Sequence, residues 1–173
     1  MSYRAVAAFV VVAALAGCGT RTAPTTHGAS APKPLRLQGG CPKFDGKKPT
    51  SGAPGAQRAL VPGQPGALLL CRYSGLNGHS RLTLTRSRAI TDAATVAHLA
   101  HDLNALPPPS PRALNCPADF ADAGLMFFFY AHGPGDPVSV GLSGCQDVAN
   151  GHLHRLAGLP RSPLPGELAR LTR

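Results

Sequence analysis

The sequence predicts an α+β fold: a small antiparallel sheet of order β-β-α-β-β, with one helix packed on one face and two disulfides. Two strand–turn–strand patterns lie on either side of a segment with helical periodicity, and four cysteines are spread through the same region. One sheet with the helix on one face is the simplest assembly that buries the apolar sides of such elements. A chain of 173 residues fits one domain.

The first hairpin is expected to run from "GALLLCRYS", residues 66–74, to "RLTLTRS", residues 81–87. The first run is apolar, as a buried strand is, and the Asn-Gly pair between the two runs favours a tight turn. In the second run, leucines alternate with polar residues. Leu82 and Leu84 are therefore expected to share one half-buried face.

A helix is expected in "TDAATVAHLAHDLNAL", residues 91–106, because its apolar residues recur at helical spacing and Thr91 or Asp92 can cap the first turn. "PPPSP", residues 107–111, must end the helix, because proline has no amide hydrogen to continue it. "LMFFFYA", residues 125–131, is apolar on both faces and is expected to be a central strand, beside which "VSVGLSG" returns.

Shorter segments complete the expected domain, which spans residues 41–160. Leu60-Val61, just before Pro62, is a candidate edge strand. "ELARLT" can form a short helix in a C-terminal tail, residues 161–173.

The first 18 residues have the pattern of an exported lipoprotein. Arg4 is followed by a twelve-residue apolar stretch, which is too short to span a bilayer and fits the core of a secretory leader. "LAGC", residues 15–18, resembles the lipobox of bacterial lipoproteins. In that family the cysteine receives a diacylglyceryl group, and the leader is cut before it. The resemblance implies a signal peptide at residues 1–17 and a lipidated Cys18.

Residues 18–40 are expected to be the lipidated cysteine and a disordered tether, because they are rich in Thr, Ala, Pro and Gly and show no apolar period. Two acyl chains of palmitate size give stable anchoring where one does not, and a diacylglyceryl group carries two. The resemblance therefore implies a protein anchored on the extracytoplasmic face of the cell membrane.

Four cysteines remain besides Cys18, an even number that predicts two disulfides in an exported domain. Three pairings are possible. Cys41–Cys71 with Cys116–Cys145 is favoured, because each pair would flank its own local unit. A zinc site is the competing interpretation, but no two cysteines have the C-x2-4-C spacing that such sites use.

The segments around these cysteines are similar to small two-disulfide lipoproteins of high-GC actinobacteria. The likeness rests on "LLLCRYSG", the central helix, "CPADF" and "GCQDVANG". It implies a place in the cell envelope and no particular activity.

The formal net charge of +9 indicates either a solubilising surface beside an anionic envelope or a basic patch that binds phosphate-rich polymers. Nucleic acid is not expected as a partner. The sequence has no Lys/Arg run longer than two, few aromatic residues, and no helix-turn-helix or RNP pattern.

Two groups of histidines are of the type that can bind a metal. His98, His101 and Asp102 lie on the polar side of the expected helix, and His152 and His154 alternate in "GHLHR". Exposure to solvent accounts for both groups equally well. Two helical histidines do not complete a zinc shell, which needs three or four protein ligands, so no metal site is expected.

"GLSGC", residues 141–145, differs from the nucleophile motif G-x-S-x-G in its second glycine, and no helical pattern follows, so Ser143 is not expected to be a nucleophile. Asp119 and Asp122 straddle Phe120, where turn formation explains them. The "FFFY" run is expected in the core.

The sequence thus favours a non-catalytic binding or assembly module of the cell envelope, with no catalytic residue and no cofactor. Its expected partners are the membrane, through Cys18, and an envelope protein or an anionic wall polymer. The alternative is an envelope metal-dependent hydrolase, or a metal or small-ligand carrier, that uses the surface histidines.

Overall fold

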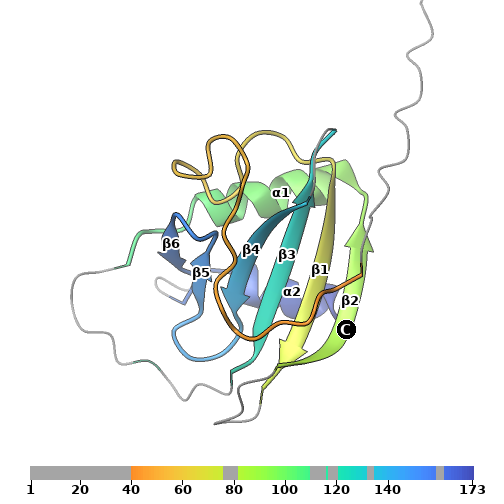
Figure 1. Ribbon diagram of the computed structural model, residues 1–173, viewed down its shortest axis with the longest axis vertical. Coiled ribbons are helices and arrows are strands. Elements are labelled where there is room, and N and C mark those ends of the chain that lie inside the picture. Colours follow the sequence, from red (N-terminus) through yellow and green to blue (C-terminus); the bar gives the residue numbers. More distant parts are fainter. Residues whose placement is uncertain (1–39, 76–81, 110–115, 117–120, 132–134, 159–161) are drawn as a thin grey trace, which may run out of the picture. The chain divides into compact units, whose positions relative to one another are not determined.

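A six-stranded antiparallel sheet forms the centre of the domain (Figure 1). The structure is a computed structural model that describes residues 40–75, 82–109, 116, 121–131, 135–158 and 162–173, all within one unit, Pro34–Arg173. The strands are β1 (Ala67–Ser74), β2 (Thr83–Ile90), β3 (Ala123–Phe129), β4 (Asp136–Gly141), β5 (Asp147–Ala149) and β6 (His154–Leu156). They lie in the order β2-β1-β3-β4-β5-β6, and every neighbouring pair is antiparallel.

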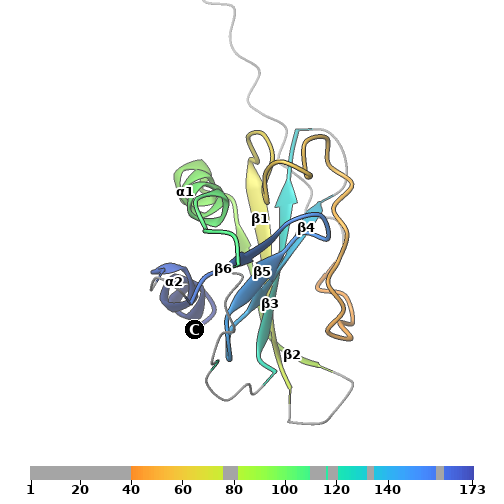
Figure 2. The same cartoon turned by 90° about the vertical axis from the view of Figure 1, so that its left-hand side faces the viewer.

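Two helices, α1 (Ala93–Asn104) and α2 (Leu164–Leu171), lie on the same side of this sheet (Figure 2). The N-cap of α1 is Asp92, whose carboxylate accepts a hydrogen bond from the backbone N–H of Thr95 (2.7 Å). This bond satisfies one of the amide groups that the first turn of a helix leaves free. The helix stops at Asn104, shortly before the prolines that were expected to end it.

One hydrophobic cluster contains buried side chains from both helices and from the sheet. Leu99 of α1 and Leu168 of α2 belong to it, together with Leu68 of β1 and Met126 and Phe128 of β3. The strands alternate between two faces, so the odd-numbered neighbours on β1 and β3 point the other way. The expectation that the "FFFY" run is core is confirmed for Phe128 and Phe129, which are 0% and 7% exposed, whereas Phe127 and Tyr130 are only partly buried.

A second cluster lies on the opposite face of the sheet and is contacted by the chain that precedes β1. Cys71 and Tyr73 of β1 belong to it, with Cys41 and Phe44 packed against them. The Tyr73 hydroxyl donates a hydrogen bond to the carbonyl oxygen of Pro42 (2.6 Å), and the rings of Phe44 and Tyr73 lie 5.3 Å apart. Burial raises the pKa of the Tyr73 hydroxyl. The first described residues are thereby fixed to the face that the helices leave free.

The two disulfides are Cys41–Cys71 and Cys116–Cys145, as predicted. Their Cα atoms lie 5.7 Å and 4.9 Å apart, and the paired residues are separated by 30 and 29 positions in the sequence. The first disulfide joins the segment before β1 to the middle of that strand, and the second joins the chain before β3 to the turn that follows β4.

The α+β class and the antiparallel pairing of both predicted hairpins are confirmed, but the sheet has six strands, where the order β-β-α-β-β predicted four. The additional strands β5 and β6 have three residues each. Such short strands cannot show an alternating pattern, which needs four or more residues. The short helix expected at "ELARLT" is α2, which starts earlier than expected, at Leu164.

The edge strand predicted at Leu60-Val61 does not form, although both residues are buried. Side chains take the place of a neighbouring strand. The Val61 N–H donates to Asn104 Oδ1 (2.9 Å), and Asn104 Nδ2 donates to the Val61 carbonyl (2.8 Å). The amide of Asn150 reaches the Leu60 carbonyl (3.3 Å). The prediction of an edge strand at this pair is therefore wrong.

The prediction that Leu82 and Leu84 share a half-buried face is half right. Leu82 packs against the second cluster and makes a single β-bridge to Phe44. Leu84 is 43% exposed. It lies on β2, which is an edge of the sheet, and it is not among the described side chains that pack against the second cluster.

Candidate functional site

Two arginines lie directly opposite each other on adjacent strands, Arg72 on β1 and Arg86 on β2. Arg72 follows Leu70 by two positions, so it lies on the helix side of the sheet, beyond the end of the hydrophobic cluster. Like charges that face each other across a sheet are destabilising. Arg72 and Arg86 are therefore expected to repel each other in the folded protein.

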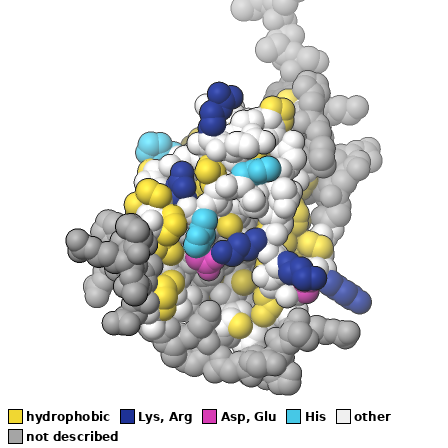
Figure 3. Space-filling model, turned by 60° about the vertical axis from the view of Figure 1, so that its left-hand side comes forward, with side chains coloured by type: hydrophobic (Ala, Val, Ile, Leu, Met, Phe, Trp, Pro, Cys, Tyr) yellow, Lys and Arg dark blue, Asp and Glu magenta, His cyan; other side chains and the backbone are white. Residues whose placement is uncertain are grey.

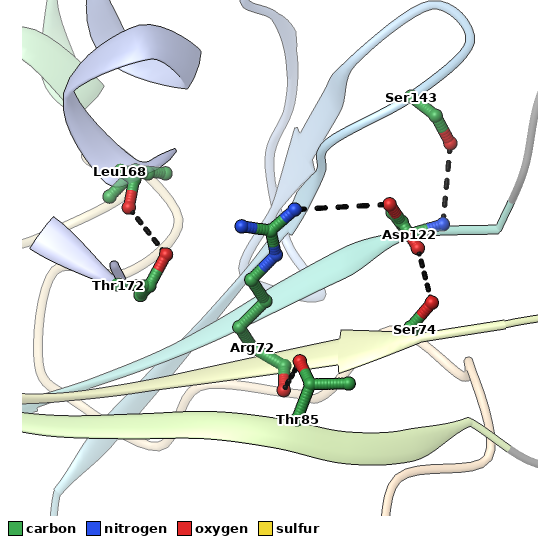
Figure 4. A network of polar contacts seen from close by, with 7 residues as sticks. All are labelled: Arg72, Ser74, Thr85, Asp122, Ser143, Leu168 and Thr172. Atoms are coloured by element: carbon green, nitrogen blue, oxygen red, sulfur yellow. Dashed lines mark hydrogen bonds and ion pairs between the residues drawn. The ribbon is translucent and has the colours of Figure 1, made fainter. Parts of the chain in front are cut away.

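A network of polar contacts holds Arg72 in place (Figure 4). Its guanidinium lies 4.0 Å from a carboxylate oxygen of Asp122, which precedes β3. The other oxygen of Asp122 accepts a hydrogen bond from the Ser74 hydroxyl (2.9 Å). The Thr85 hydroxyl donates to the backbone carbonyl of Arg72 (3.1 Å). Asp122 is thus the acid that partly neutralises Arg72, and its own orientation is fixed by Ser74.

The C-terminal end of α2 is brought to the same place. Arg88, on the same face of β2 as Arg86, donates to the carbonyl oxygen of Leu171 (3.2 Å). The buried hydroxyl of Thr172 donates back to the Leu168 carbonyl (2.8 Å), which closes the last turn (Figure 4). These bonds place Thr172 and the residue that follows it beside the two opposed arginines.

Together these elements line an open cavity of about 540 Å³. Its lining residues are Arg72, Ser74, Thr85, Arg86, Asp122, Thr172 and Arg173. We call it the arginine pocket. The side chains of these residues supply three guanidinium groups, three hydroxyls and one carboxylate. No acid of the described residues forms an ion pair with Arg86 or Arg173. Guanidinium and hydroxyl groups donate hydrogen bonds to anions, so this chemistry suits a phosphate or carboxylate ligand.

Two lysines elsewhere on the domain form ion pairs with acids. Lys47 lies 3.1 Å from a carboxylate oxygen of Asp45, and Lys48 lies 2.7 Å from one of Asp147. The Lys47 contacts, its backbone N–H first, lower the pKa of Asp45. On the face drawn in Figure 3, acidic side chains likewise lie beside Lys or Arg. The arginine pocket differs from these pairs because three guanidinium groups share the one side-chain carboxylate of Asp122.

The structure does not bring the two histidines of α1, His98 and His101, into one group of possible metal ligands. His98 Nε2 lies 3.6 Å from Asp102 Oδ2 and 3.8 Å from Glu167 Oε2 of α2. His101 is exposed and lies outside this group. Sequence reasoning missed Glu167, which joins the group only through the contact between the two helices.

The structure also separates His152 from His154. His152 Nε2 lies 3.0 Å from the carbonyl oxygen of Ser51. His154 Nε2 lies 3.5 Å from Asp147 Oδ2, the carboxylate that also pairs with Lys48. Each imidazole therefore has its own local partner, and the "GHLHR" segment does not gather them into one site.

The remaining candidates have structural contacts. The hydroxyl of Ser143 accepts a hydrogen bond from the backbone N–H of Asp122 (3.3 Å), in the turn between β4 and β5. Asp122 belongs to the arginine pocket, a role that the turn interpretation did not foresee. Cys18 and Asp119 lie outside the described residues.

The most strongly shifted titratable group lies apart from the arginine pocket. The hydroxyl of Tyr130 and one carboxylate oxygen of Asp136 are buried and have no hydrogen-bond partner among the described residues. Burial, with a contribution from the Asp136 carboxylate, raises the pKa of Tyr130 far above its usual value. The phenol therefore stays protonated, which makes it unsuited to act as a base or nucleophile.

No protein-family model matches this chain, and neither a curated protein nor a solved structure is significantly similar to it. In the part of the chain that the structure describes, neither helix is long and apolar enough to cross a membrane.

Proposed function

We propose that this protein is a membrane-anchored extracytoplasmic binding module, without catalytic activity, which binds an anionic polymer of the cell envelope through the arginine pocket. The observation that carries the proposal is the direct opposition of Arg72 and Arg86 across β1 and β2. An anion between the two guanidinium groups would remove their repulsion, whereas the pocket's own acid, Asp122, reaches only Arg72.

The shape of the pocket favours a polymer as the ligand. Its 540 Å³ cavity opens to solvent, and two of its three arginines, Arg86 and Arg173, are exposed. A chain of repeated phosphate or carboxylate groups can cross such a cavity and continue on either side. Each guanidinium offers a planar fork that can hold one such group through two hydrogen bonds.

The proposed location, on the extracytoplasmic face of the membrane, is supported by a separate set of features. "LAGC" follows a short apolar stretch, as in bacterial lipoproteins, and Cys18 would carry the lipid. The two disulfides suit an oxidising compartment outside the cytoplasm. An anchor on Cys18 would hold the arginine pocket close to the anionic polymers of the envelope.

Binding is tested by titrating the full-length protein with two soluble probes, polyphosphate and poly-glutamate, near physiological salt. The variant Arg86→Ala/Arg173→Ala should bind at least about a hundredfold more weakly, because each of the two lost charged hydrogen bonds is worth on the order of 1.5 kcal/mol and every 1.4 kcal/mol is a factor of about ten. The matched control is Lys43→Ala/Arg58→Ala, which removes the same charge from exposed positions that do not line the pocket. Equal weakening by the two variants would mean that binding follows net charge, and would contradict the proposal.

The anchor is tested by replacing Cys18 with serine. The wild type should be found processed in the membrane fraction, and the variant should be released or remain uncut. A Cys18→Ser protein that is still processed and still membrane-bound would show that the lipid anchor is wrong.

A further inference from the structure

Three metal-ligating side chains from two helices converge on one point. His98 and Asp102 lie four residues apart on α1, a spacing that puts both side chains on the same face. Glu167 comes from the first turn of α2. The two helices are in contact and lie on the same side of the sheet (Figure 2). One ligand atom from each residue lies within 4.8 Å of the other two.

The two carboxylates are largely withdrawn from water. The side chain of Asp102 is 18% exposed and that of Glu167 is 13% exposed, whereas His98 is 59% exposed. Among the described residues, only His98 pairs with either carboxylate, and no Lys or Arg does. Two half-buried carboxylates close together repel each other, and a single imidazole offsets that repulsion only when it is protonated.

The spacing of the ligand atoms is close to that of a metal shell. In a tetrahedral zinc site with bonds of about 2.0–2.1 Å, neighbouring ligand atoms lie about 3.3 Å apart. The His98 nitrogen lies 3.6 Å from the Asp102 oxygen and 3.8 Å from the Glu167 oxygen. The Asp102 and Glu167 oxygens lie within 4.8 Å of each other, so the two carboxylates would rotate toward each other for all three atoms to reach bonding distance. The fourth position would open on the exposed side, where His98 lies.

We propose that His98, Asp102 and Glu167 bind one divalent transition-metal ion, with zinc chemistry, and that the ion links α1 to α2. One imidazole and two carboxylates form a ligand set that Zn²⁺ accepts. Mg²⁺ prefers an octahedral shell of oxygens and is the weaker candidate. This site is separate from the arginine pocket and does not depend on the function proposed for it, since the two have no residue in common.

The test is calorimetric titration of the full-length protein with Zn²⁺ alone, and with Mg²⁺ for comparison. One Zn²⁺ should bind per chain with micromolar affinity and raise the melting temperature. His98→Ala and Glu167→Gln should each weaken binding at least about tenfold, since even the loss of a group that only orients a ligand has an effect of this size. His101→Ala is the matched control: it removes an exposed histidine of the same helix and should leave the affinity within about twofold of the wild type.

A melting curve without metal shows whether each variant is folded, and Glu167→Gln keeps the side-chain shape if His98→Ala does not fold. Three results would overturn the proposal: no stoichiometric binding of Zn²⁺ by the wild type, unchanged binding by the folded Glu167→Gln variant, or equal losses in His98→Ala and His101→Ala. Mg²⁺ binding as tight as that of Zn²⁺ would also refute the assigned metal class.

Discussion

The side-chain amide of Asn150 donates a hydrogen bond to the carbonyl oxygen of Ala56 (2.9 Å), across more than half the length of the domain's sequence. The same nitrogen reaches the carbonyl of Ala59 (3.0 Å). The other end of the amide, Oδ1, accepts from the backbone N–H groups of His152 (3.0 Å) and Leu153 (2.8 Å). Asn150 is 0% exposed, so a single buried side chain joins the irregular segment before β1 to the turn between β5 and β6.

Replacing Asn150 with alanine should lower the free energy of unfolding by about 3 kcal/mol, because several buried backbone groups lose their partner. Asn150→Asp should do at least as much damage, since it removes both amide donors and places a carboxylate against carbonyl oxygens. The measurement is chemical denaturation. Asn104→Ala is the comparison: it removes two bonds, both to the backbone of Val61, and should lose about 1–2 kcal/mol. A smaller loss at Asn150 than at Asn104 would contradict this account.

These asparagines also show where sequence reasoning stops. The apolar run of β1 and the capped start of α1 are local patterns, and both were predicted. An edge strand was predicted at Leu60-Val61 from the apolar pair that stands just before Pro62. The backbone carbonyls of this pair accept hydrogen bonds from the side chains of Asn104 and Asn150, which are distant in the sequence. The spacing of apolar residues along the chain cannot predict partners of this kind.

The two disulfides should be reduced in a fixed order, Cys116–Cys145 first. Cys71 is 0% exposed inside the second cluster, whereas Cys116 is exposed. The chain segments closed by the two disulfides have nearly the same length, so the access of the thiol to each disulfide is expected to set the order of reduction. Limited treatment with a thiol, followed by alkylation and mass mapping, measures it. Earlier labelling of Cys71 than of Cys116 would show the assigned exposures to be wrong.

Losing the Cys41–Cys71 disulfide should reduce stability substantially. A loop of about 30 residues corresponds to roughly 3.5 kcal/mol on the chain-entropy model. The Cys41→Ser/Cys71→Ser variant should also expose the apolar face around Tyr73 and Phe44, because the segment that packs there is no longer held. Denaturation and binding of a hydrophobic dye test both effects. A variant as stable as the wild type would contradict the prediction.

The N-cap of α1 should make stability fall at acid pH. Hydrogen bonds from the hydroxyl of Thr95 (2.6 Å) and from its backbone N–H (2.7 Å) lower the pKa of Asp92 below 3.8. Because the folded pKa is depressed, this stabilisation is present above pH 3.8 and is lost as the pH falls through the folded value. Asp92→Asn should flatten that part of the pH profile.

Melting temperatures measured between about pH 6 and pH 2.5 test this linkage. Thr95→Val removes the hydroxyl donor and keeps the backbone donor, so it should flatten the profile less than Asp92→Asn does. Parallel profiles for the wild type and Asp92→Asn would mean that the cap does not contribute to acid stability.

The two proposed sites were less predictable than the fold. A two-residue turn at Asn77-Gly78 would place Leu82 opposite Tyr73, but Leu84 lies there, and a further irregularity follows between Arg72 and Tyr73. The opposition of Arg72 and Arg86 therefore could not be counted from the turn, which itself lies outside the described residues. Glu167 was missed because only the packing of α2 beside α1 brings it to His98.

Two glycines with nearly the same backbone conformation should respond very differently to alanine. Gly46 has φ +82° and Gly151 has φ +85°, a region that L-residues adopt at a cost of roughly 1–2 kcal/mol. A Cβ atom on Gly46 would meet nothing within 4 Å. On Gly151 it would lie 2.6 Å from the Cα of Thr50 and 2.7 Å from the carbonyl oxygen of Pro49.

Gly46→Ala should therefore lose only the conformational term, about 1 kcal/mol of unfolding free energy. Gly151→Ala adds a collision with backbone atoms that cannot rotate away, so it must displace the segment at Thr50 from the turn after β5. Since forced repacking typically costs a further 1–3 kcal/mol, the total loss should be about 3 kcal/mol or more. Denaturation of the two variants side by side separates the terms, because the conformational strain is common to both. Equal losses would mean that the close approach of Thr50 to Gly151 does not exist in solution.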